Sequence, residues 1–281
     1  MLKQILEMNT WDLFQYLQNI LVTELGLKVI EDGENYIFYE ASNSPLCLVA
    51  HIDTIKREQV KLEQSQNIIR NKYGVLGADD RAGVYGIIQL LYLCREHNVP
   101  YPSVLFTNFE EQGGIGVKCF IDDWSHAEPF KNTWLFIELD RANANQYVYY
   151  SWDLPFEVKN YVESFGFVEQ HGSYSDIADL TEAFLIPSVN LSVGYYNQHT
   201  AHEQLHVDEL QLTINRVFAM LQNPIEQLYP VDQSFYEDYW NEDELLSEED
   251  NQNYNHFTYD DFERAYQIQG KEENFLARFR Y

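Results

Sequence analysis

Residues 46–53, LCLVAHID, join a short apolar run to two side chains that commonly bind metal ions. The run Leu46–Ala50 has the continuous apolar pattern of a buried parallel strand, and His51 and Asp53 follow directly after it. In an open α/β sheet, ligands bind at the carboxyl ends of the strands. The segment therefore predicts a parallel sheet with a polar site at the end of this strand.

The rest of the chain supplies neighbours for this strand. Further apolar runs predict buried strands at Ser103–Thr107, Trp134–Leu139 and Ser188–Val193. Apolar residues spaced by three and four predict helices over Trp11–Glu24, Asp80–His97, Ser175–Ala183 and Asp208–Leu221, and Gly116–Phe120 opens another. Shorter strands are expected at Lys28–Ile30, Tyr36–Tyr39 and Tyr147–Ser151, with a hairpin over residues 56–73. This alternation indicates an α/β fold, in which a mainly parallel mixed sheet is covered by helices on both faces.

The composition changes after Asn223-Pro224. Residues 1–224 are numerous enough to form one large domain with a full core. Residues 225–281 are rich in Glu, Asp, Tyr and Asn and poor in aliphatic side chains. We interpret them as an acidic, aromatic-rich appendage that is partly helical or disordered.

The net charge and the cysteines indicate which partners and which cellular compartment to expect. A net charge of −27 repels nucleic acid phosphate, so no nucleic acid partner is expected. The three cysteines form no CxxC pair, which favours free thiols in a reducing compartment. The N-terminus lacks the pattern of a signal peptide, and no apolar run approaches 18 residues. We therefore expect a cytoplasmic protein without a membrane partner.

Potential metal ligands recur where the predicted strands end. Glu110 and Glu111 follow the run SVLFTNF, Asp140 follows WLFIEL, and His199 lies soon after SVNLSVG. Asp79 and Asp80 lie in GADDRAG, residues 77–83, at the start of a predicted helix. Taken singly, each motif has an ordinary explanation, such as a helix cap or a solvated turn. Their convergence on one edge of the sheet favours a metal site.

The residue types suit two metal ions. Zinc binds imidazole nitrogen and carboxylate oxygen readily. Two ions require several acids, including a carboxylate that bridges them, and they make a bridging water acidic enough to attack near neutral pH. A carboxylate that binds no metal can then take the proton of that water. The pair Glu110-Glu111 can supply one acid of each kind.

The ordered motifs resemble the zinc-dependent exopeptidase superfamily, which includes the M28 aminopeptidases and the M20 peptidases such as PepT. The resemblance rests on HID at 51–53, GADDRAG at 77–83, EEQGGIG at 110–116, Asp140 and HTAHE at 199–203, and it spans roughly residues 46–221. It implies a phosphorylase/hydrolase-like fold and makes residues 1–224 a metallopeptidase catalytic domain. Only about 58 residues, 141–198, separate Asp140 from His199. The M20 lid domain does not fit there, so the chain looks closer to the lidless M28 architecture.

The resemblance also implies a role for each motif. His51 and Asp140 would bind one ion, Glu111 and His199 the other, and Asp79 would bridge them, with a peptide bond after it that is often cis in such enzymes. Asp53 would support the imidazole of His51, and Glu110 would be the general base. Two positions stay open, because Glu138 could replace Asp140 and His202 could replace His199. The cofactor would be two Zn²⁺ ions per chain, although such sites also accept Co²⁺ or Mn²⁺.

Substrate recognition is less determined. The segment HGSYSDIADL, residues 171–180, resembles a superfamily loop, and Ser175 is a candidate contact to the substrate backbone. Arg81 and Arg141 adjoin the proposed ligands and are suited either to a substrate carboxylate or to pairing with surplus acids. Glu138 and Asp176 are candidates for an acidic pocket that receives a substrate ammonium group.

We therefore expect a two-zinc exopeptidase, an aminopeptidase or a di- or tripeptidase, that cleaves short peptides with a metal-bridging water and Glu110 as general base. An N-acyl amino acid deacylase or amidase on the same site is one alternative. A non-catalytic binding module on a peptidase scaffold is another. Self-association into a homo-oligomer is compatible with each of these hypotheses.

Overall fold

A computed structural model describes residues 1–42, 44–57, 59–124, 130–150, 153–172 and 174–225. The appendage predicted at 225–281 lies outside these residues, apart from Ile225. Within them, no helix combines the length and the apolar character needed to span a lipid bilayer. The cytoplasmic location stays a prediction.

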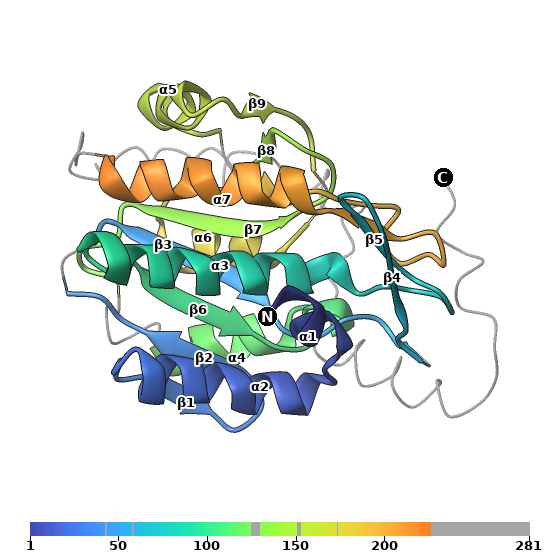
Figure 1. Cartoon of the computed structure of the whole chain (residues 1–281). Coiled ribbons are helices and arrows are strands. Elements are labelled where there is room, and N and C mark those ends of the chain that lie inside the picture. The colour runs from blue at the N-terminus through green and yellow to red at the C-terminus, as the bar shows by residue number, and fades with distance from the viewer. Residues whose placement is uncertain (43, 58, 125–129, 151–152, 173, 226–281) are drawn as a thin grey trace, which may run out of the picture. The chain divides into compact units, whose positions relative to one another are not determined.

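The main sheet is mixed and eight-stranded, in the order β1-β2-β6-β3-β7-β10-β8-β9 (Figure 1). Its centre is parallel, because β6, β3, β7 and β10 pair in parallel registers. β2 joins β6 and β8 joins β10 in antiparallel registers. The strands are β1 (Ile30–Asp32), β2 (Tyr36–Tyr39), β3 (Leu46–His51), β6 (Ser103–Thr107), β7 (Leu135–Arg141), β8 (Gln146–Val148), β9 (Val168–Glu169) and β10 (Ser188–Ser192). The predicted mainly parallel mixed sheet is confirmed.

The side chains of β3 show why both faces of the sheet are covered. Successive side chains of a strand point to opposite faces, and Leu46, Leu48 and Ala50 belong to one buried cluster whereas Cys47 and Val49 belong to another. The first cluster includes side chains of α2 (Thr10–Gln18), α3 (Ala78–His97) and α7 (Val207–Gln222). The second includes side chains of α4 (Ile115–Trp124) and α6 (Asp176–Phe184). Figure 1 shows α3 and α7 in front of the sheet and α4 and α6 behind it, which confirms the predicted layers.

A second sheet of four short strands lies in the order β11-β12-β5-β4. The predicted hairpin over residues 56–73 corresponds to β4 (Leu62–Ser65) and β5 (Ile68–Asn71). The strands β11 (Tyr195–Tyr196) and β12 (Gln204–His206) are absent from the sequence-based prediction. They are too short to show a hydrophobic period, yet their pairing forms the hairpin whose tip carries His199.

Several helices also differ from the prediction. The helix expected over Trp11–Glu24 is α2 followed by a π-helical segment, η1 (Asn19–Glu24). Two helices were not predicted: α1 (Leu2–Glu7), which is too short for a periodic signal, and α5 (Phe156–Ser164). In the described part of residues 141–198, the elements join the two sheets or pack on the main one, and they form no lid domain.

Candidate metal centre

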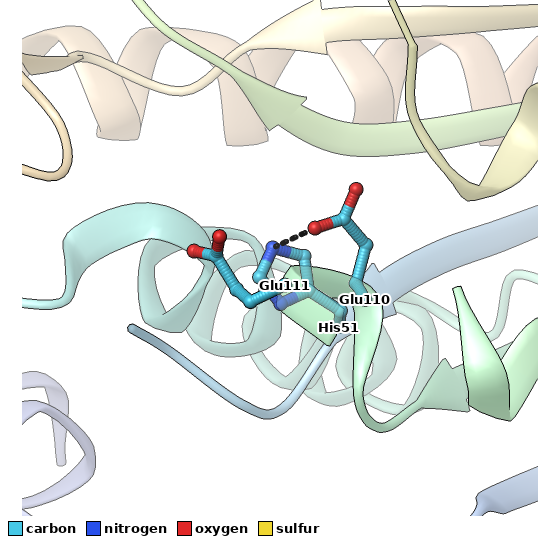
Figure 2. A group of neighbouring side chains, drawn as sticks. All are labelled: His51, Glu110 and Glu111. Carbon is cyan, nitrogen blue, oxygen red and sulfur yellow. Dashed lines mark ion pairs between the residues drawn. The ribbon is translucent and has the colours of Figure 1, made fainter. Parts of the chain in front are cut away.

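Side chains from strand ends and loops meet at the carboxyl edge of the parallel strands. β3 ends at His51, and the 3₁₀ helix η2 (Glu110–Gln112) follows β6. In the view of Figure 2, the carboxylates of Glu110 and Glu111 lie on either side of the His51 ring. One ligand atom from each of these three side chains lies within 4.8 Å of the others. Segments far apart in the sequence are thus brought together as their strand-end positions predict.

One half of the centre surrounds the buried imidazole of His51, whose exposed fraction is 1%. Its Nδ1 lies 3.2 Å from Asp53 Oδ1, and its Nε2 lies 3.2 Å from Asp79 Oδ1 and 3.6 Å from Asp140 Oδ1. The hydroxyl of Tyr195 donates to Asp140 Oδ1 at 3.1 Å and holds that carboxylate beside the ring. His51, Asp79 and Asp140 form a group that could hold a metal ion.

The other half surrounds His199, whose side chain is 47% exposed. Its Nε2 lies 3.1 Å from Asp79 Oδ2 and 2.7 Å from Glu111 Oε1. His199 adopts a left-handed backbone conformation, with φ of 62°, at the tip of the β11–β12 hairpin. Asp79, Glu111 and His199 form a second potential metal-binding group. The two groups share Asp79, which presents one carboxylate oxygen to each.

The donor set and its spacing fit two zinc ions. Zinc bonds to nitrogen and oxygen of roughly 2.0–2.2 Å in a tetrahedron place neighbouring ligand atoms roughly 3.3–3.6 Å apart. The contacts of His51 with Asp79 and Asp140, at 3.2 and 3.6 Å, lie close to that spacing. The contact of His199 with Asp79, at 3.1 Å, is slightly shorter. The contact of His199 with Glu111, at 2.7 Å, is shorter still, so these two side chains would move apart to hold an ion.

Glu110 lies beside both groups. Its Oε2 is 4.0 Å from His51 Nε2 (Figure 2). Burial raises the pKa of Glu110, and the neighbouring carboxylates of Glu111 and Asp79 raise it further, against a lowering effect of His51. A carboxylate with a raised pKa that is not part of the two groups sharing Asp79 is suited to accept and return a proton.

Asp53 connects the end of β3 to the two glutamates. Its Oδ1 accepts the backbone N–H of Glu110 at 3.1 Å, and its Oδ2 accepts that of Glu111 at 3.2 Å. The same carboxylate contacts His51 Nδ1. Asp53 therefore fixes the imidazole ring and the backbone of the glutamates together. The supporting role that the resemblance implies for Asp53 stays a prediction.

The loop that carries Asp79 is held by Glu203, which is 1% exposed. Glu203 Oε2 accepts the N–H groups of Leu76 and Gly77 at 2.8 and 2.7 Å. Its Oε1 accepts those of Ala78 and Asp79 at 2.8 and 3.2 Å. One carboxylate thus satisfies four consecutive backbone donors that would otherwise be buried without partners.

The peptide bond between Asp79 and Asp80 is cis, as the resemblance implies. Asp80 is fully buried, and its carboxylate accepts the backbone N–H of His51 at 3.2 Å and that of Gly83 at 3.0 Å. A Cβ atom at Gly83 would lie 1.9 Å from the carbonyl oxygen of Leu139, so only glycine permits this approach of α3 to β7.

The electrostatics of the centre reflect an excess of carboxylates. Burial lowers the pKa of His51, but Asp140, Asp53 and Asp79 outweigh burial and raise it well above its usual value. Hydrogen bonds to Asp79 and Glu111 raise the pKa of His199 to about 10. Burial and the charge of Asp79 raise the pKa of Asp140 well above its usual range. Bound cations would offset this mutual repulsion.

The structure distinguishes the residues that the sequence left as alternatives. Asp140 belongs to a potential metal-binding group, whereas Glu138 is fully buried and accepts the hydroxyl of Ser175. His199 contacts two of the proposed ligands, whereas His202 is exposed and its backbone N–H donates to Thr200 at 3.1 Å. The structure thus brings Asp140 and His199 into the centre and leaves Glu138 and His202 outside its potential metal-binding groups.

The proposed substrate-binding residues lie around the centre rather than in it. Ser175 and Asp176 are buried, and Asp176 accepts the hydroxyl of Thr107. Burial raises the pKa of Asp176 to about 7, and the charge of Glu110 contributes. Arg141 donates to Gln146 Oε1 at 3.2 Å and to the carbonyl of His171 at 3.3 Å. Their roles stay predictions.

Arg81 donates hydrogen bonds to backbone carbonyl groups rather than to a carboxylate. Its guanidinium is fully buried and donates to the carbonyl groups of Ile5 and Met8 at 3.0 and 3.1 Å. Arg57 also donates to Met8, at 2.8 Å. The sequence could not show this, because the acceptors are backbone atoms at the end of the unpredicted α1.

Sequence reasoning also missed the structural parts played by Glu203, Asp80 and Tyr195. The motif HTAHE shows the spacing of His199 and Glu203, but it does not show that the Glu203 carboxylate accepts hydrogen bonds from four backbone N–H groups. Tyr195 lies four residues before His199 and carries no motif. Its contact with Asp140 arises from the pairing of β11 with β12.

Solved structures and a family model relate the chain to known proteins. Among curated protein sequences, none matches this chain. Aminopeptidase PepT from Bacillus cereus has a similar fold, with a TM-score of 0.64 and 15% identity over 78% of this chain and 96% of that one. A tripeptidase from Staphylococcus aureus gives a TM-score of 0.62 and 16% identity over 78% and 95% of the two chains. The dodecamer PhTET1-12s gives 0.57 and 13% over 78% and 97%.

The decisive comparison is with a family model. The model of peptidase family M28 matches residues 37–267, which is more than half of the sequence and includes every residue of the candidate centre. The fold, the ordered motifs and this match agree, and the chain therefore belongs to peptidase family M28, which makes it a metallopeptidase.

Proposed function

We propose that the protein is an exopeptidase that uses two zinc ions to cleave short peptides. The observation that carries this proposal is the pair of potential metal-binding groups that share Asp79, one with His51 and Asp140 and one with Glu111 and His199. A shared carboxylate between two such groups is the arrangement that binuclear hydrolytic centres use.

The ions, when bound, would lower the pKa of a water between them and polarise the scissile carbonyl. The chain's own residues supply the proton transfers. Glu110 takes a proton from the attacking water and delivers it to the amine that leaves, since its carboxylate adjoins both groups. Asp53 keeps Glu110 in place through the backbone N–H and orients the ring of His51.

Short peptides are the substrate class favoured by the comparisons. Two structures of similar fold are described as an aminopeptidase and a tripeptidase. Membership of family M28 favours a peptide bond over the bond of an N-acyl amino acid as the one that is cleaved. It also argues against the hypothesis of a non-catalytic binding module. One similar fold is described as a dodecamer, and self-association of this chain stays a prediction.

The test compares the protein with a Glu110→Gln variant after zinc loading. The wild type should bind two zinc ions per chain and hydrolyse dipeptides or aminoacyl chromogenic substrates. The variant should bind the same number of ions but lose about 10²–10⁴-fold in kcat, which is the typical contribution of a general acid or base. Metal content is counted by mass spectrometry with plasma ionisation, and hydrolysis is followed by amine release. Full activity of the variant would contradict the role of Glu110, and a wild type without peptidase activity would contradict the proposed function.

A further inference from the structure

An asparagine lies buried in the main sheet, next to the candidate metal centre. Asn190 is 2% exposed and belongs to β10, which pairs with β7 on one side and with β8 on the other. Its neighbours Val189 and Leu191 are apolar, as is usual in a strand that is buried on both faces. Asparagine is seldom fully buried, and a buried polar side chain needs hydrogen-bond partners. The partners of Asn190 therefore indicate what the amide does there.

One partner of Asn190 is the backbone of Asp140. The side-chain Oδ1 of Asn190 accepts the N–H of Asp140 at 3.0 Å. The carbonyl of Asp140 accepts the hydroxyl of Tyr195 at 2.7 Å. Both backbone groups of this proposed metal ligand thus bind side chains from β10 and β11. The Asp140 carboxylate lies 3.6 Å from His51 Nε2, so a shift of this backbone would move a ligand atom within the centre.

A register shift explains why the backbone of Asp140 takes a side chain as its partner. Asn190 pairs with Glu138, but Ser192 pairs with Arg141, so β10 advances by two residues where β7 advances by three. β7 therefore holds one extra residue at this point, which makes a β-bulge. Bulges are rare in parallel pairs, interrupt the ladder of backbone hydrogen bonds, and often re-aim a side chain beside an active site. The amide of Asn190 supplies an acceptor where the ladder is interrupted.

The other partner of Asn190 fixes which way the amide points. Its Nδ2 donates to Ser175 Oγ at 3.3 Å, and the hydroxyl of Ser175 donates to the carboxylate of Glu138. A serine hydroxyl has one proton, so Ser175 can only accept from Asn190. The NH₂ group must therefore face Ser175, and the amide oxygen must face the N–H of Asp140. An apolar side chain of similar size would take this acceptor away from a buried N–H.

We propose that Asn190 is a positioning residue that acts through Asp140, because it holds the bulge of β7 so that the Asp140 carboxylate faces the metal site of His51. Asn190 itself binds neither an ion nor the substrate. Its effect should be confined to one half of the centre, since the second potential metal-binding group does not include Asp140. This inference rests on the proposed two-zinc function.

The experiment measures the zinc affinity of one site at a time by competition with a chromophoric chelator. His199→Ala should leave only the site of His51, and His51→Ala only the site of His199. Adding Asn190→Leu to the His199→Ala protein should lower its zinc affinity about 10–100-fold, as changes of groups that orient metal ligands do. The same substitution in the His51→Ala protein should leave the zinc affinity unchanged. Asn190→Asp keeps an oxygen that can accept the N–H of Asp140 and should retain most of the affinity.

Ser103→Ala is the matched control. Ser103 is 1% exposed, and its hydroxyl oxygen accepts the backbone N–H of Ala41 at 3.0 Å, at the end of β6 opposite the centre. This variant removes a hydrogen bond of the same kind, so a general loosening of the sheet would lower its zinc affinity as well. We expect both of its zinc sites to keep their affinity. Asn190→Ala adds no bulk, carries the same expectation as Asn190→Leu and replaces it if the leucine variant does not fold.

The outcomes separate this inference from the proposed function. Unchanged zinc affinity in Asn190→Leu, or equal losses in the two single-site proteins, would overturn the positioning role. An equal loss in Ser103→Ala would overturn it too. If the wild type binds two zinc ions but cleaves no peptide, the peptidase function falls, whereas a loss confined to the site of His51 would still support the role of Asn190. A wild type that binds no zinc would overturn both proposals.

Discussion

The two halves of the candidate centre are built in different ways. His51 ends a central strand, is 1% exposed and is fixed by Asp53, so the sheet itself determines its position. His199 is nearly half exposed and lies at the tip of a hairpin formed by two short strands. The first half is preorganised by the core of the protein. The second depends on contacts between loops, and Asp79 belongs to both.

The most damaging single change should be at the ligand that the halves share. Asp79→Asn removes a negative charge and replaces one of the two oxygens, each of which faces one histidine, by an NH₂ group. We therefore expect fewer than two bound zinc ions and a loss of about 10³-fold or more in kcat. Metal catalysis contributes several kcal/mol, and each 1.36 kcal/mol is tenfold in rate. Metal analysis and steady-state kinetics measure both effects. Asp122→Asn, at an exposed position on α4, is the control. Two tightly bound ions in Asp79→Asn would rule out a bridging role.

A comparison of His51→Ala with His199→Ala would test the difference between the halves directly. Each variant should lose one zinc site. In the metal-free state, His51→Ala should lower the free energy of unfolding by about 2 kcal/mol more than His199→Ala, because it leaves a cavity and unpaired carboxylates in the buried half. Urea unfolding of the metal-free proteins measures this difference. Equal losses of stability would show that burial does not distinguish the two halves.

The same contrast explains what the sequence could predict. LCLVAHID and WLFIELD carry an apolar run directly into a polar residue, so His51 and Asp140 could be placed at one sheet edge from pattern alone. The environment of His199 could not, since β11 and β12 are too short to show a period. The buried guanidinium of Arg81 escaped prediction for a similar reason, because it bonds to backbone carbonyls whose position depends on tertiary packing. The positions of residues fixed by strand periodicity could be predicted from the sequence. The positions of residues fixed by contacts between loops could not.

Glu203 provides the test with the smallest expected effect. It links the segment that carries His199 to the loop that carries Asp79. It lies four residues after His199, and its two oxygens receive the N–H groups of residues 76–79. Glu203→Gln replaces one oxygen by an NH₂ group, which cannot accept from two of the four donors. Each buried donor left without an acceptor costs about 1–3 kcal/mol.

The loop that carries Asp79 should therefore be held less firmly in Glu203→Gln. We expect zinc affinity to fall about 10–100-fold, as when other groups that orient metal ligands are changed, while two ions still bind at saturating zinc. Competition with a chromophoric chelator measures the affinities. His202→Ala changes an exposed residue of the same hairpin that contacts none of the ligands and should leave the affinities unchanged. Wild-type affinity in Glu203→Gln would show that the sheet alone positions Asp79, and loss of an ion in His202→Ala would move the second site to that histidine.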